Sequence, residues 1–194
     1  MSLKEIISDL FTNIRDIVLT EIEKDNLKRE SNFIFAQLSK YKENKNYIQY
    51  INFLIEHENE LNDIEKYSFE VLEIILEEVK ELENQNNLEE AIKKIDEILN
   101  INGINNIIKA SCLNIQGNLL LGLSQDNKNE AFEKFYSALE IFPNDSNYSK
   151  NIEISFPYTT NITEMEMYIN KVYKYKNSFS ENFVSTLAFF EMII

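Results

Sequence analysis

The side chains that most often perform chemistry are scarce in this sequence. His57 is the only histidine, so a metal site or an acid–base pair that needs two histidines is excluded, and we expect this side chain at a helix end or partly packed. Cys112 is the only cysteine, and its neighbours Ala110, Leu113 and Ile115 are apolar. We therefore expect a small core residue there, not a nucleophile. No intrachain disulfide can form, which favours a reducing compartment.

Motifs for nucleotides and calcium are incomplete. Gly117 and Gly122 are followed by Leu123 and Ser124, where a phosphate-binding loop needs Lys and then Ser or Thr. The segment Asp126–Glu130 offers oxygen atoms but lacks the glycine and the distant bidentate glutamate of a calcium loop. The many other carboxylates are expected on solvated helix faces. We predict no catalytic residue, no metal and no cofactor, and hence no enzyme in this chain by itself.

The composition indicates long helices and a protein partner. Only three glycines and two prolines occur among 194 residues, too few for the turns of an all-β fold. The net charge of −14 repels nucleic acid and anionic membrane surfaces and favours a basic or neutral protein segment. No stretch approaches the ~20 apolar residues of a membrane span, and the first ten residues lack the order of a secretory signal. A cytoplasmic location is expected.

Apolar residues recur at helical spacing along most of the chain. The pattern predicts a long amino-terminal helix over 2–22 and three helical hairpins over 33–55, 62–99 and 110–143. An irregular connection is expected over 144–161, because Pro143 and Pro157 push the residue before each of them away from helical geometry. A helical element over 162–194 completes a single domain over 1–194. That element ends on apolar residues up to Ile194, as though a longer protein were cut there.

The third hairpin has the most regular pattern. Small and large apolar residues alternate at fixed offsets on its two helices: Leu113, Gly117 and Leu120, then Ala131, Phe135, Ala138 and Pro143. This pattern resembles the tetratricopeptide repeat, and a degenerate form of it covers residues 30–143. The resemblance implies an all-α, right-handed α-α superhelix with extra helices at both ends, in which Gly117 and Ala131 allow close backbone approach and Phe135 fills the gap to the next unit. An ordinary helical bundle whose helices have equal lengths is the alternative.

A second likeness lies beyond the repeats. Phe156-Pro157-Tyr158, followed by Glu164–Tyr168 and Lys171, is similar to the segment that leaves the repeats in bacterial O-GlcNAc-transferase-like (SPINDLY-type) proteins. That likeness implies that this chain is the non-catalytic amino-terminal part of a glycosyltransferase. The catalytic domain would then lie beyond Ile194.

In a tetratricopeptide-like stack the first helices of the hairpins line a concave face. In this register the expected lining residues are Glu73, Leu76, Lys80, Ser111, Asn114, Asn118 and Leu121. Asn114 and Asn118 could hydrogen-bond a peptide backbone, or they could be solvated polar residues. We therefore predict a scaffold that binds a protein or peptide. A substrate-presenting arm of a glycosyltransferase and self-association through the last helix are the alternatives.

Overall fold

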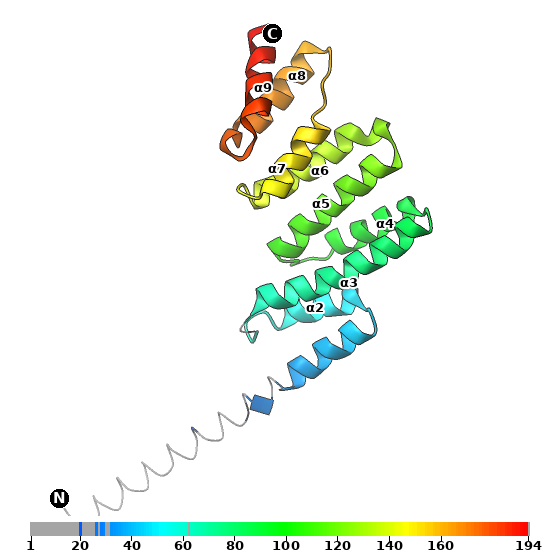
Figure 1. Cartoon of the computed structure of the whole chain (residues 1–194). Coiled ribbons are helices and arrows are strands. Elements are labelled where there is room, and N and C mark those ends of the chain that lie inside the picture. The colour runs from blue at the N-terminus through cyan, green and yellow to red at the C-terminus, as the bar shows by residue number, and fades with distance from the viewer. Residues whose placement is uncertain (1–19, 21–25, 27, 30–31, 62, 194) are drawn as a thin grey trace, which may run out of the picture. The chain divides into compact units, whose positions relative to one another are not determined.

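The computed structural model describes residues 20, 26, 28–29, 32–61 and 63–193. All regular structure in these residues is helical, which confirms the all-α fold class (Figure 1). The helix predicted over 2–22 lies outside the described residues except for Thr20. The chain separates into two compact units, Met1–Ile64 and Glu65–Ile194, and each is described by itself. The single domain over 1–194 and the right-handed superhelix stay predictions.

The first unit contains a helical hairpin, as predicted. A helix over 32–43 is followed by a turn in which Lys45 has a positive φ of 51°, and then by α2 (Tyr47–Glu56). Asn46 caps α2, because its side chain accepts a hydrogen bond of 3.1 Å from the backbone N–H of Gln49. His57 is the C-cap residue of α2, which confirms its predicted place at a helix end. Its ring centroid lies 4.2 Å from that of Phe53.

The second unit is a run of antiparallel helices joined by short connections (Figure 1). They are α3 (Ile64–Asn84), α4 (Leu88–Leu99), α5 (Asn106–Leu123), α6 (Lys128–Ile141), α7 (Ser146–Ser155), α8 (Ile162–Tyr173) and α9 (Glu181–Ile193). Single 3₁₀ turns over Gln125–Asn127 and Lys176–Ser178 precede α6 and α9. Helix α5 packs against both α4 and α6, α6 packs against α7, and α8 packs against α9. Lys94 of α4 also donates a hydrogen bond to Glu78 of α3, so the two hairpins predicted over 62–99 and 110–143 are present.

The hairpin of α5 and α6 is closely packed at the glycine singled out in the sequence. Phe135 is fully buried, and its ring lies directly over Gly117. A Cβ atom added at Gly117 would lie 2.5 Å from Cε1 of Phe135, so the ring occupies space that any other residue would need. At this contact the ring fills space inside its own hairpin. Ala131 and Ala138 are also fully buried.

The predicted irregular connection over 144–161 is wrong for most of its length, because α7 occupies 146–155. Asp145 caps this helix: its Oδ1 accepts hydrogen bonds from the backbone N–H groups of Asn147 (2.8 Å) and Tyr148 (3.2 Å). One face of α7 is buried through Tyr148, Ser149, Ile152 and Ser155. The two prolines flank the helix without interrupting it, since Pro143 follows α6 and Pro157 comes two residues after Ser155. Within that range only 144–145 and 156–161 are irregular.

The carboxy-terminal helices are present as predicted. Glu153 of α7 fixes the start of α9, because its carboxylate accepts hydrogen bonds from the N–H (2.6 Å) and the hydroxyl (2.8 Å) of Ser180. Phe156 is fully buried and packs edge-on against Phe183, with 5.4 Å between the two ring centroids. Phe189 and Met192 of α9 are 56% and 78% exposed. Self-association through α9 stays a prediction.

Candidate functional site

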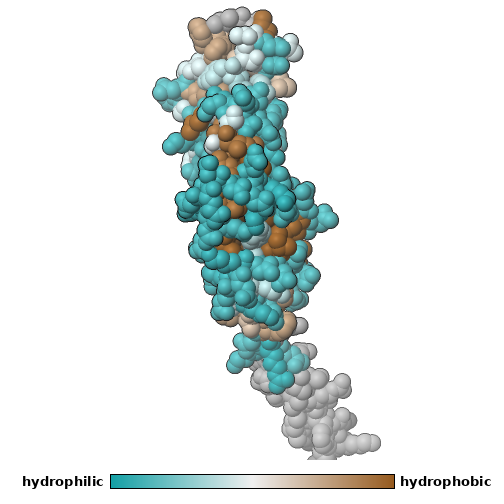
Figure 2. Space-filling view, turned by 90° about the vertical axis from the view of Figure 1, so that its right-hand side faces the viewer, coloured by the Kyte–Doolittle hydropathy of each residue, from teal (hydrophilic) through white to brown (hydrophobic). Residues whose placement is uncertain are grey.

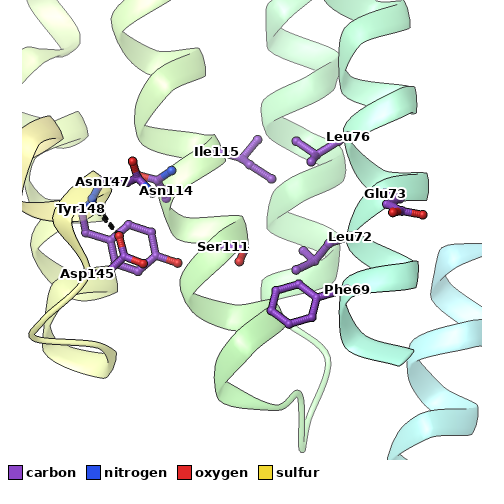
Figure 3. Close-up of a pocket in the computed structure, with 10 residues that line it drawn as sticks. All are labelled: Phe69, Leu72, Glu73, Leu76, Ser111, Asn114, Ile115, Asp145, Asn147 and Tyr148. Atoms are coloured by element: carbon purple, nitrogen blue, oxygen red, sulfur yellow. Dashed lines mark hydrogen bonds between the residues drawn. The ribbon is translucent and has the colours of Figure 1, made fainter. Parts of the chain in front are cut away.

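A cavity of about 460 Å³ opens between α3, α5 and α7 (Figure 3). Ten residues line it: Phe69, Leu72, Glu73 and Leu76 of α3, Ser111, Asn114 and Ile115 of α5, and Asp145, Asn147 and Tyr148 at the start of α7. The volume falls in the range of about 300–1,000 Å³ that is usual for ligand sites. Every second helix of the second unit contributes to it, from α3 to α7.

The wall formed by α3 is largely apolar. Its apolar lining residues Phe69, Leu72 and Leu76 are spaced by three and four positions, so they lie on one helix face. Phe69 is 57% exposed and Leu76 is 39% exposed, whereas Leu72 below them is buried. Ile115 faces this wall from α5 (Figure 3). The exposed faces of Phe69 and Leu76 can therefore lose water when a second apolar group enters the cavity.

The opposite wall is polar and is built on the start of α7 (Figure 3). Asp145 precedes the first turn of α7, and Asn147 lies in that turn. One carboxylate oxygen of Asp145 caps the helix by accepting hydrogen bonds from two backbone N–H groups. Tyr148 directs its phenol toward the side of α5 that carries Ser111 (Figure 3). Burial raises the pKa of Tyr148, and the Ser111 hydroxyl opposes that rise in part. The phenol is therefore neutral near pH 7 and can both donate and accept hydrogen bonds.

Asn114 lies between these two walls and joins α5 to α7. Its side-chain oxygen accepts a hydrogen bond of 2.7 Å from Nδ2 of Asn151. Its backbone oxygen accepts one of 3.0 Å from Nδ2 of Asn118. The bond from Asn151 orients the Asn114 side-chain amide, whose Nδ2 group carries the donors that a bound backbone carbonyl would need.

Four of the seven residues expected to line the groove are brought together in this cavity: Glu73, Leu76, Ser111 and Asn114. The other three do not line it. Lys80 is exposed one turn beyond Leu76, Asn118 folds its amide back onto its own helix, and Leu121 packs against the hydrophobic core of the second unit.

Sequence reasoning missed six lining residues, namely Phe69, Leu72, Ile115, Asp145, Asn147 and Tyr148. Two of them have a local signal, since Phe69 and Leu72 lie one helical turn before Glu73 and Leu76. The residues of α7 were missed because that segment was predicted to be irregular. Asp145 followed by buried positions at helical spacing is the signal that could have found them.

The groups capable of nucleophilic or metal chemistry lie elsewhere. Cys112 is fully buried and does not line the cavity, and burial raises the pKa of its thiol to about 12. His57 directs Nδ1 toward Glu60, at 2.7 Å from Oε2. Within the described residues, no group of three or more His, Cys, Asp or Glu side chains is arranged to hold a metal ion. None of the helices in that part of the chain has the length and apolar character needed to cross a bilayer.

The comparisons with known proteins assign no class to this fold and site. No protein-family model matches the sequence, and no curated protein or solved structure matches it significantly. The resemblances to the tetratricopeptide repeat and to SPINDLY-type proteins stay predictions.

Proposed function

We propose that this chain is a binding module that holds a segment of another protein in the cavity between α3, α5 and α7. The observation that carries the proposal is the composition of that cavity, whose volume is about 460 Å³. An apolar wall on α3 faces a wall on α7 that can form hydrogen bonds. A peptide presents both kinds of group at once, since its side chains can be apolar while its backbone is polar.

The geometry favours a short segment over a folded domain. The cavity has room for a few side chains, and it is open at the surface. Phe69 is more than half exposed, so a ligand side chain that covers it would gain roughly 1.5–3 kcal/mol from apolar burial. The Asn114 amide is held by a hydrogen bond from Asn151 before any ligand arrives, which reduces the entropy lost on binding.

The surface composition and the net charge of the chain bear on the kind of partner. Figure 2 shows a mostly hydrophilic face on which apolar side chains gather in separate patches. The net charge of −14 makes nucleic acid and anionic membranes poor competitors for a protein partner. The proposal places the protein in the cytoplasm.

The test is a selection of displayed random peptides on the immobilized chain, followed by fluorescence polarization with each selected peptide. Phe69→Ala removes most of the exposed apolar wall, and we expect it to weaken binding about tenfold or more. Phe189→Ala is the matched control, because Phe189 is exposed to nearly the same extent (56% against 57%) but lies on α9, away from the cavity.

Circular dichroism of both variants checks that the helices remain. The proposal is refuted if no selected peptide binds, or if the peptides that bind lose the same affinity with Phe189→Ala as with Phe69→Ala. Peptides that depend on Phe69 alone support it.

A further inference from the structure

The turn between α4 and α5 contains the only asparagine in the sequence that is followed by a glycine. We infer that this residue, Asn102, is a site of spontaneous covalent modification, at which water replaces the side-chain amide nitrogen and leaves aspartate or isoaspartate. Asn102 and Gly103 are both exposed, so water reaches them. This inference does not depend on the proposed binding of a peptide.

The backbone of this turn leaves the nitrogen of Gly103 accessible. Gly103 is the third residue of a turn over 101–104 and has a φ of 82°, which glycine adopts without steric cost. The N–H of Ile104 closes the turn on the carbonyl oxygen of Ile101 at 3.5 Å, longer than a usual N–H···O bond. Because glycine has no Cβ atom, no side chain of its own shields the nitrogen that follows Asn102.

The two groups that would react carry no hydrogen bonds. Within the part of the chain that the structure describes, the N–H of Gly103 donates no hydrogen bond, and the side chain of Asn102 makes none. The Asn102 side chain can therefore rotate until its Cγ atom approaches the nitrogen of Gly103.

A turn in the first unit shows how the same chemistry is blocked. Asn44 is exposed in the turn before α2, and Lys45 after it also has a positive φ. The N–H of Lys45 donates a hydrogen bond of 3.0 Å to the carbonyl oxygen of Lys42. The Asn44 side chain donates one of 2.8 Å to the carbonyl oxygen of Lys40. Both reacting groups are held in this turn, whereas both are free at Asn102.

The reaction needs only water. The nitrogen of Gly103 loses its proton to the solvent and attacks Cγ of Asn102, which forms a cyclic imide and releases the side-chain nitrogen as ammonia. Water then opens the imide. Cleavage of the bond between the nitrogen and Cγ leaves aspartate, and cleavage of the bond between the nitrogen and the main-chain carbonyl carbon leaves isoaspartate. Asparagine and water are thus converted to a carboxylate and ammonia, and nothing is oxidized or reduced.

The modification would act on a connection next to the cavity. Either product adds a negative charge, and isoaspartate also inserts a methylene group into the main chain shortly before Asn105. Asn105 caps α5 by accepting a hydrogen bond of 3.0 Å from the N–H of Ile108. Its Nδ2 donates one of 2.7 Å to Oγ of Ser68 on α3. Ser68 is followed by Phe69 of the apolar wall, so the altered turn is linked to that wall.

The experiment follows the full chain by peptide mapping and mass spectrometry during incubation at mildly alkaline pH. One sample is folded, and the other is unfolded in guanidinium chloride. Asn102 should be converted in the folded chain at a rate within about threefold of that in the unfolded chain, because an exposed turn needs little free energy to open. Asn44 should be converted about tenfold or more slowly in the folded chain than in the unfolded chain, because its hydrogen bonds must break first.

Two variants locate the product. Asn102→Gln keeps an amide but would have to form a larger and less favourable ring, and Asn44→Gln is the matched control in the other turn. An isoaspartate-specific methyltransferase should detect product in Asn44→Gln and lose its signal with Asn102→Gln, while circular dichroism checks that both variants keep their helices.

The inference is overturned if the folded chain protects Asn102 as strongly as Asn44, or if the isoaspartate signal survives in Asn102→Gln. Neither result would affect the proposed function, because peptide binding is measured on freshly purified chain and depends on Phe69.

Discussion

The two faces of α5 are built from the same helix and have different properties. On the sides that pack against α4 and α6, Cys112, Gly117 and Leu119 are buried, and Phe135 of α6 fills the space above the glycine. On the other face Ser111, Asn114 and Ile115 are half-buried and open to the cavity. The first face is closed by shape, so small changes in volume are costly there. The second face is held by hydrogen bonds and retains room for a ligand.

The largest expected effect concerns how readily a reagent dissolved in the solvent reaches the buried side chains of α5. Cys112 is fully buried, and burial raises its pKa to about 12, so the folded chain should not react with a thiol reagent such as dithionitrobenzoate at pH 8. If reaction requires global unfolding, it should be slowed by about a thousandfold or more relative to the unfolded chain. The absorbance of the released thiolate measures both rates, with guanidinium-unfolded protein as the control.

The same thiol predicts a direction for stability at high pH. Its folded pKa lies above the usual value of about 9, so the unfolded chain loses its proton first as the pH rises. Its contribution to stability should therefore be constant below pH 9 and fall between about pH 9 and 12.

Rapid labelling of Cys112 in the folded chain at pH 8 would contradict the difference between the two faces of α5, because it would show that both faces are equally open.

Part of the packing on this buried face could be predicted from the sequence. The contact of Gly117 with Phe135 depends on residues of one hairpin, and the spacing of small and large side chains already encodes it. Helix α7 is not predicted, although Asp145 and the buried positions after it are local signals, because Pro143 and Pro157 indicate an irregular connection. Prolines that flank a helix are compatible with it, whereas a good cap directly favours it.

The candidate site was less predictable than the fold. The lining residues on α3 and α5 follow from their helical faces, which is why Glu73, Leu76, Ser111 and Asn114 could be expected. The polar wall depends on the packing of α7 beside α5, which includes the hydrogen bond from Asn151 to Asn114 across 37 positions of the chain. A periodic pattern does not report such a contact. The side chains of Asn118 and Leu121 were displaced from the expected groove by a local hydrogen bond and by core packing.

The second largest effect is expected from a single methyl group on the buried face. Gly117→Ala places a Cβ atom 2.5 Å from Cε1 of Phe135, so the ring or the helix must move. Overpacking of this kind costs about 1–3 kcal/mol, against a gain of up to about 1 kcal/mol in helix propensity. Thermal and urea unfolding should show a net loss of about 1–2 kcal/mol.

A smaller side chain at the facing position provides the control for that change. Phe135→Leu leaves a cavity beside Gly117 and is itself destabilizing. The double variant should be less unstable than the sum of the two single variants, because the new methyl group then enters space that the ring has vacated. Strict additivity would mean that the ring and the glycine are not in contact.

The smallest effect is expected on the open face, where the Ser111 hydroxyl lowers the pKa of Tyr148 beside the cavity. Ser111→Ala removes one partially exposed polar group, so it should cost at most about 1 kcal/mol of stability. It should also move the pKa of Tyr148 further above its usual value, since the hydroxyl now opposes the effect of burial. A titration followed by NMR of ¹³C-labelled tyrosine measures that change. If Ser111→Ala destabilizes the chain as much as Gly117→Ala does, then the cavity face also holds the fold together, and the division between a packed face and a binding face of α5 is wrong.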